Sequence, residues 1–190
     1  GSDLFYNGFR RADFAKPYGL EKLGVENAGV FVTRGVLVDV ASYKAVERLE
    51  IGYVITREDL EGALSAQSLS LRPGDAVFIR TGHGALWMRD NAKYNSGEPG
   101  IGLAAAKWLI SRKIVLVGAD NFGVEAVPGE NEDRVWEVHQ WLIARNGIYN
   151  LENLDLDGLA KDRVYEFAFV FAPLKLKGAT GSPGNPIALR

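Results

Sequence analysis

The sequence predicts an α/β domain with a mixed sheet, and three observations support this fold class. Apolar, β-branched runs of strand length alternate along the chain with segments of helical periodicity. The order strand, helix, strand favours parallel pairing of neighbouring strands. The chain has 190 residues, of which 47% are hydrophobic, so it can bury a real core within the length of one domain. We therefore expect residues 1–190 to form a single domain.

Regular structure is expected to begin after the first 28 residues, which carry aromatic side chains without clear periodicity. The run Val30–Val40 is rich in β-branched residues and predicts a strand. A helix is predicted to follow Thr56 and to run through Gln67. Thr56 and Asp59 come close to a capping box, which marks the start of a helix, and apolar and small residues follow at helical spacing.

The next segments predict a strand and a long loop. A turn over 72–75, with sequence RPGD, leads into a short buried strand over Ala76–Thr81. The polar stretch Gly82–Pro99 is rich in Gly and Asn and predicts a loop. Loops of this length are often functional.

The second half of the chain predicts two helices and two strands. The Ala-rich segment Gly102–Arg112 predicts a packed helix, and Ile114–Val117 predicts an apolar strand. A helix is predicted over Glu130–Asn146, because Glu130, Glu132 and Asp133 suit its positive end and Gly147 suits its C-terminal stop. The last predicted strand is Tyr165–Pro173, and the turn-rich tail 178–186 follows it.

The composition of the chain excludes several classes of function and partner. The 22 basic and 24 acidic residues give a formal charge of −2 without a block of like charge, so we predict no nucleic-acid partner. The absence of cysteine excludes a thiolate metal site and a cysteine nucleophile, and any metal must be held by His, Asp or Glu. No apolar run approaches the length of a membrane span, so we expect a cytoplasmic protein without membrane partners.

Gly1 and Ser2 resemble residues left by cloning, so we expect the natural start to lie elsewhere.

The two histidines, His83 and His139, are too far apart in sequence to belong to one local motif. His139 lies with Val135, Val138 and Leu142 at helical spacing, so we expect it on the apolar stripe of its helix. An imidazole in that place needs a partner. From this feature alone, a neutral hydrogen-bonded core histidine is favoured over a metal ligand.

Two carboxylates are further candidates. Glu152 stands between Leu151 and Leu154 in the sequence NLENL, and alternation predicts that it faces away from Leu151. A buried carboxylate needs a compensating charge or metal, although a solvated or capping glutamate is the commoner case. Asp120 follows an apolar strand, where sites form in open α/β sheets, but a loop-capping role is equally open.

His83 is flanked by Gly82 and Gly84 in the long loop, which could let the backbone approach a ligand in a pocket. We favour the interpretation of His83 as a plain exposed histidine. The run Gly100–Ala105 matches G-x-G-x-x-A, but a polar loop precedes it in place of a strand, which argues against a nucleotide-binding role.

The chain resembles the cyclase family of metal-dependent hydrolases, whose best-known activity is kynurenine formamidase. The resemblance is carried by GADNFGVEAVPGENEDRVWEVHQWLIARNGIYNLENLDLDGLA, VYEFAFVFAPLKLKGATGSP, FYNGF, GLEKLGV, VTRGVLVDVA, LRPGDAVFIRTG and GEPGIGLAAAKWL. It implies a swivelling β/β/α fold and hydrolysis of a small amide, such as an N-formyl aryl amide, with a metal-activated water. It also implies one or two divalent metals, zinc or manganese, and a dimer or tetramer.

By the same resemblance, His139 and Glu152 are metal ligands, and His139 is the candidate catalytic residue. The family's other ligands come from an N-terminal His-x-Gly-Thr-His-x-Asp motif that this sequence lacks. DLFYNGF, at 3–9, resembles the segment just downstream of it, so we expect the chain to be truncated at its N-terminus and to bind metal weakly. The alternatives are a catalytically degenerate binding or assembly module with the same fold and, less favoured, a nucleotide-binding protein.

Overall fold

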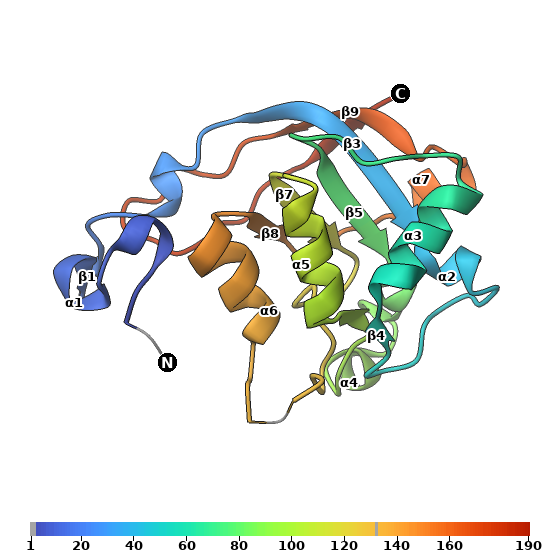
Figure 1. The fold of residues 1–190 in the computed structure, drawn as a ribbon, viewed down its shortest axis with the longest axis horizontal. Helices are drawn as coiled ribbons and strands as arrows, with labels where there is room; N and C mark the ends of the chain where they lie inside the picture. The colour runs from blue at the N-terminus through green and yellow to red at the C-terminus, as the bar shows by residue number, and fades with distance from the viewer. Residues whose placement is uncertain (1–2, 132) are drawn as a thin grey trace.

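The computed structural model describes residues 3–131 and 133–190, so Gly1, Ser2 and Glu132 lie outside the described residues. Its centre is one six-stranded sheet (Figure 1). The strands are β3 (Phe31–Asp39), β5 (Ala76–Arg80), β7 (Leu116–Ala119), β8 (Tyr149–Leu151), β9 (Glu166–Phe171) and β10 (Ile187–Leu189). They lie in the order β10-β9-β3-β5-β7-β8. From β3 to β8 the strands pair in parallel, whereas β9 pairs antiparallel with β3 and with β10. The predicted α/β fold with a mixed sheet is confirmed.

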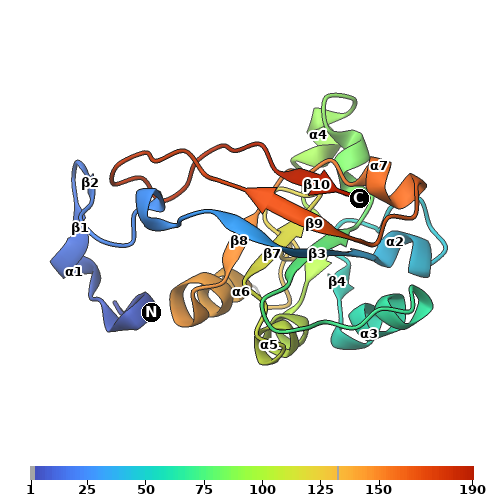
Figure 2. The ribbon, with the colours of Figure 1, turned by 90° about the horizontal axis from the view of Figure 1, so that it is seen from above.

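One face of the sheet is covered by helices (Figures 1 and 2). They are α3 (Arg57–Ala66), α5 (Leu103–Ser111) and a helical segment made of α6 (Glu137–His139) and the π-helix η4 (Gln140–Arg145). The side chains between this layer and the sheet form the larger core cluster, in which Val36, Val77 and Val117 come from the central strands. These strands are buried on both faces, as their continuous apolar sequences predict.

The ends of α3 follow its local sequence. Thr56 accepts a hydrogen bond from the backbone N–H of Asp59, and Asp59 accepts one from the backbone N–H of Thr56, so the predicted capping box is confirmed. The helix ends at Ala66, with Gln67 as its C-cap.

Replacing Thr56 with alanine is expected to lower the free energy of unfolding by about 1 kcal/mol, because the N–H of Asp59 loses its acceptor. Urea denaturation of the variant and the parent measures the difference. Thr56→Ser keeps the hydroxyl and is the control, so an equal loss in both variants would contradict the role of the cap.

The opposite face of the sheet carries a second, aromatic-rich cluster with Phe78, Phe167, Phe169 and Phe171. The helix α7 (Asp157–Lys161) lies against the end of β3. An open groove of about 1750 Å³ lies on this face, bounded by residues of the N-terminal segment and of the β9–β10 connection. These two segments run out from the sheet together (Figure 2), joined where the N–H of Leu20 donates to the carbonyl of Gly178 at 2.8 Å.

The shorter elements lie in the connections, and several were not predicted. The segment 82–99 holds two helical turns, η3 and α4, where a loop without structure was predicted. Strands β8 and β10 were also missed. The remaining elements are η1 (Tyr6–Gly8), α1 (Arg11–Phe14), β1 (Ala15–Lys16), β2 (Gly19–Leu20), η2 (Val25–Asn27), α2 (Val40–Tyr43), β4 (Val54–Ile55), η3 (His83–Leu86), α4 (Asn91–Tyr94) and β6 (Gly100–Ile101).

The helix predicted over Glu130–Asn146 begins only at Glu137, so its first half was wrong. The carboxylate of Glu130 accepts from the backbone N–H of Leu103 at 2.6 Å, and so caps α5 and not its own segment. Trp136 has a left-handed backbone, with φ of 58°. Val135 is 67% exposed and does not join the apolar stripe, whereas Val138 and Leu142 are buried.

In the part of the chain that the structure describes, no helix is long and apolar enough to cross a membrane.

Candidate functional site

Three side chains from separate segments meet at the short helix α6. His139 is the last residue of α6, Glu125 lies after β7, and Glu152 directly follows β8. His139 Nδ1 lies 2.5 Å from Glu125 Oε1, and His139 Nε2 lies 3.3 Å from Glu152 Oε1. The imidazole is therefore held between two carboxylates. The predicted alternation is confirmed, because Leu151 packs against the aromatic cluster while Glu152 faces His139.

Glu125 fixes both the backbone and the ring of His139. Its carboxylate accepts hydrogen bonds from the backbone N–H of Val138 at 3.2 Å and of His139 at 2.9 Å, besides the contact with Nδ1. The N–H groups in the first turn of a helix lack partners within the helix, and a carboxylate satisfies them. Glu125 is thus the cap of α6 and the residue that orients the imidazole.

The charges of this cluster shift the pKa of His139. Burial disfavours the imidazolium, but the hydrogen bonds to Glu125 and Glu152 outweigh it and raise the pKa of His139 to about 9. The expected alternative of a neutral core histidine is therefore not what this structure favours, since an imidazolium lies between the two carboxylates at neutral pH.

A third carboxyl group, Glu98, lies close to this cluster and has no exposed surface. Its Oε2 accepts from the backbone N–H of Phe122 at 2.6 Å, whereas Oε1 has no hydrogen-bond partner among the described residues. Burial, with a contribution from the charge of Glu152, raises the pKa of Glu98 to about 8 against the opposing effect of the backbone N–H groups of Phe122 and Gly123. Glu98 is therefore largely neutral at pH 7.

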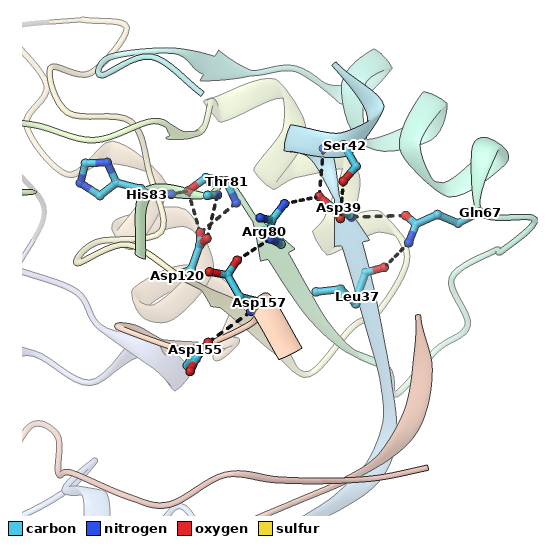
Figure 3. A network of polar contacts seen from close by, with 11 residues as sticks. Leu37, Asp39, Ser42, Gln67, Arg80, Thr81, His83, Asp120, Asp155 and Asp157 are labelled. Carbon is cyan, nitrogen blue, oxygen red and sulfur yellow. Dashed lines mark hydrogen bonds and ion pairs between the residues drawn. The ribbon is translucent and has the colours of Figure 1, made fainter. Parts of the chain in front are cut away.

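Asp120, a predicted pocket residue, is buried and binds the end of the neighbouring strand (Figure 3). Its Oδ1 accepts from the backbone N–H and the hydroxyl of Thr81 at 2.8 and 2.6 Å, and its Oδ2 accepts from the N–H of Gly82 at 2.8 Å. Burial raises the pKa of Asp120, against these three donors. Its partners lie 39 and 38 residues away, so its role is to join the ends of β5 and β7, not to cap its own loop.

Further polar contacts fasten the carboxyl ends of β3 and β5 (Figure 3). Arg80 donates to Asp39 at 3.1 Å and to Asp157 at 2.9 Å, and Asp39 also caps α2 through Ser42. Gln67, the C-cap of α3, donates to the carbonyl of Leu37 at 2.9 Å. These contacts join the end of β3 to α2 and α3, and the end of β5 to α7.

His83 is buried, so the expectation of an exposed histidine was wrong. Its ring stacks on Tyr94 with centroids 4.9 Å apart, and its Nε2 lies 3.1 Å from the carbonyl oxygen of Tyr94. Burial lowers the pKa of His83. Among the described residues, no hydrogen bond, ion pair or ring stacking joins His83 to the His139 cluster. Tyr94 provides an indirect link, because its hydroxyl donates to Asn153, the neighbour of Glu152, at 2.6 Å.

The glycines of the G-x-G-x-x-A run have a packing role. A Cβ atom at Gly100 would lie 2.3 Å from the backbone carbon of Glu125, and one at Gly102 would lie 2.5 Å from Val54. The start of α5 is already capped by Glu130. Close packing of the chain explains both glycines without a phosphate ligand.

The structure therefore brings together two of the four predicted site residues, His139 and Glu152, and places Asp120 and His83 in supporting positions. Within residues 3–131 and 133–190, no group of three or more His, Cys, Asp or Glu side chains is arranged to hold a metal ion. His139 Nε2 and the carboxylate of Glu152 remain as a pair of adjacent candidate ligands.

The Cyclase family model matches residues 19–126. Over its whole length, the chain is 38% identical to a protein described as a novel cyclase, with a TM-score of 0.90. This chain belongs to the cyclase family. It spans 64% of the length of that cyclase.

Other cyclase-fold structures are similar at lower identity. An isatin hydrolase bound to the product analogue thioisatinate is 25% identical over 84% of this chain and 60% of its own, with a TM-score of 0.68. Isatin hydrolase A from Labrenzia aggregata, bound to benzyl benzoate, is 26% identical over 87% of this chain and 64% of its own, with a TM-score of 0.66. No protein with a curated description matches the chain.

Sequence reasoning about this cyclase-family chain missed Glu125, Glu98 and Trp136. Glu125 stands in the apolar run Val124–Val127, where a lone acid is a usable signal, because a buried carboxylate needs donors or a cation. Glu98 and Trp136 lie in irregular segments, and nothing in their local sequence indicates that they approach His139.

Proposed function

We propose that the intact protein is a metal-dependent hydrolase that cleaves a small amide, with His139 and Glu152 as two of the metal ligands. The observation that carries this proposal is the orientation of His139. Glu125 engages Nδ1 and leaves Nε2 directed at Glu152. A carboxylate on one imidazole nitrogen, with the other nitrogen facing a ligand position, is the usual arrangement of a metal-binding histidine.

The donor set fits part of a metal site. An imidazole nitrogen and a carboxylate oxygen suit zinc and manganese alike. A bound divalent metal would supply an activated water and polarise the scissile carbonyl. The two residues are fewer than the three protein ligands usual for catalytic zinc, so the 190-residue chain alone is expected to bind metal weakly and to turn over N-formylkynurenine poorly.

The protein residues have distinct tasks in this proposal. Glu125 holds the imidazole in one orientation and keeps the proton on Nδ1. Nε2 must release its proton before it can serve as a ligand, so metal binding by the chain strengthens as the pH rises towards 9. Glu152 supplies the neighbouring oxygen from the end of β8.

The groove on the aromatic face supports a further part of the proposal. A cavity of about 1750 Å³ against a sheet rich in phenylalanine is larger than a small-molecule site requires. We propose that an additional segment of a longer protein covers this face as a second β-layer, giving the β/β/α arrangement, and supplies the remaining ligands. The length of the similar cyclase, of which this chain spans 64%, is consistent with such a segment. Assembly into a homo-oligomer is a second way to cover exposed apolar surface.

The relatives support an aromatic substrate. Among the similar structures, one isatin hydrolase is described with thioisatinate and another with benzyl benzoate. An N-formyl aryl amide and a cyclic aryl amide both present an amide carbonyl whose nitrogen is bonded to an aromatic ring, and the same activated water would attack either. We propose aryl amides as the substrate class.

Replacing His139 with alanine is expected to weaken zinc binding by the chain at least tenfold, because one of two ligands is lost. Chelator competition measures the dissociation constant, and elemental mass spectrometry measures zinc per chain. Glu137→Gln is the matched control, since this glutamate lies on the same helix and pairs with Arg134.

Equal zinc binding by the parent and His139→Ala would contradict the ligand assignment. Rapid metal-dependent turnover of N-formylkynurenine by the 190-residue chain would contradict the need for further ligands. Binding of aryl amides without any metal dependence would favour a degenerate binding module with the same fold.

A further inference from the structure

Glu98 is a buried carboxyl group held in a fixed place with one oxygen unused. Its backbone N–H and carbonyl pair with Val127 at 2.8 and 2.9 Å, and its carbonyl also accepts from the N–H of Gly52 at 3.1 Å. The side chain is anchored at Oε2 by the N–H of Phe122. Oε1 has no partner among the described residues, and Glu98 has no exposed surface. A buried polar atom without a partner is costly, so it needs an explanation.

The unused oxygen lies beside Trp136. A Cβ atom built on Gly123 would lie 2.7 Å from Glu98 Oε1 and 2.7 Å from the indole ring of Trp136. Gly123 therefore leaves room for both groups to approach the same point. The same indole also packs against His139, with ring centroids 5.0 Å apart and planes at 73°. Glu98 Oε1 and the imidazole thus approach one aromatic side chain.

The surroundings favour an aromatic ligand. Trp136 is 41% exposed and is the outermost of these groups, whereas Tyr94 and Phe122 lie further in, with ring centroids 5.9 Å apart. Indole and phenyl faces pack well against a planar ring.

The protonation of Glu98 decides which ligand atom fits. With its pKa raised to about 8, the carboxyl group is mostly neutral at pH 7. Oε2 accepts the N–H of Phe122, so Oε1 is the atom that carries the proton. A buried O–H without an acceptor requires an oxygen or nitrogen lone pair from outside.

We propose that Glu98 Oε1 donates a hydrogen bond to a carbonyl or carboxylate oxygen of an aromatic ligand whose ring packs against Trp136 beside His139. The inference rests on the proposed function in that this ligand is the substrate or product of the hydrolase. It adds Glu98 as a specificity-determining residue and Trp136 as the aromatic wall of the same site.

The test measures binding of thioisatinate to the 190-residue chain by isothermal titration calorimetry, with EDTA present so that metal ligation has no part. The variants are Glu98→Gln, which keeps an N–H donor in place of the O–H, and Glu98→Leu, which removes it. We expect saturable binding by the parent, an affinity within about threefold of the parent for Glu98→Gln, and at least tenfold weaker binding for Glu98→Leu. Acetate, which lacks the ring, is expected not to compete.

Infrared spectroscopy gives a second readout that does not depend on the leucine variant folding. The parent at pH 7 is expected to show a protonated-carboxyl band that is absent in Glu98→Gln and that shifts when thioisatinate is added. Thioisatinate binding is measured in EDTA and zinc binding is measured without thioisatinate, so failure of the metal proposal is separable from failure of this one.

Several results would overturn the assignment of Glu98. These are no saturable binding by the parent, equal affinities in the parent and both folded variants, or a Glu98→Gln variant as weak as Glu98→Leu, which would indicate a charged carboxylate. An infrared band that does not respond to thioisatinate would also overturn it.

Discussion

Replacing Asp120 with alanine is expected to lower the free energy of unfolding by on the order of 3 to 5 kcal/mol. The carboxylate accepts three hydrogen bonds, from the N–H and hydroxyl of Thr81 and from the N–H of Gly82. Alanine leaves these donors buried and unpaired, and each unpaired donor costs about 1 to 3 kcal/mol. Urea denaturation followed by circular dichroism measures the loss.

Two further variants make this experiment specific. Asp120→Asn keeps Oδ1 for Thr81 but presents an NH₂ group to the N–H of Gly82, so we expect a smaller loss than for alanine. Asp162→Ala removes an exposed carboxylate that pairs with Arg190 and should change stability by less than about 1 kcal/mol. A loss below 1 kcal/mol for Asp120→Ala would contradict the role given to this residue.

The metal-free chain is expected to become less stable as the pH rises from 5 to 9. The pKa of Glu98 is about 8 in the folded protein and 4.5 in an ordinary glutamate, so its contribution is fully present below pH 4.5 and is lost as the pH passes 8. The pKa of His139 is about 9 against an ordinary 6.5, so its contribution is present below pH 6.5 and is lost as the pH passes 9. Both groups hold protons more tightly in the folded state, so the two effects have the same sign.

Glu98→Gln isolates the larger part of this dependence. Each pKa unit corresponds to about 1.4 kcal/mol, so the loss from Glu98 reaches at most about 5 kcal/mol at high pH. We expect Glu98→Gln to match the parent near pH 5 and to be more stable near pH 9, as measured by urea denaturation in EDTA at both pH values. Glu137→Gln serves as the control, and a Glu98→Gln variant with the same pH slope as the parent would show that Glu98 is not the group responsible.

The sequence predicted those parts of the fold that depend on neighbouring residues. Thr56 and Asp59 bind one another across one turn, so the start of α3 was predicted correctly. Glu130 failed as a helix signal because its carboxylate binds the first turn of α5, 27 residues away. Strand β10 was missed because only its pairing with β9 makes it a strand.

In the candidate site too, residues whose role depends on distant contacts were not predicted. The pairing of His139 with Glu152 was expected from the family resemblance, which also placed both on the metal. Glu125 was not expected, since its role as the cap of α6 depends on the path of the chain after β7. Glu98 shows no local signal at all, because its burial and its unused oxygen result from packing around Phe122 and Gly123.

Because a wide helical turn follows His139, the direction of its imidazole depends on how many residues lie between His139 and Leu142. The π-helix η4 begins at Gln140, and Leu142 anchors it in the core with no exposed surface. A π-turn accommodates more residues than an α-turn, and such turns often occur at functional sites. Deleting one residue between His139 and Leu142 would let an ordinary α-helix form and would rotate the imidazole by about 100° around the helix axis, away from both carboxylates. Insertions and deletions in this short stretch would therefore destroy the site without unfolding the helix.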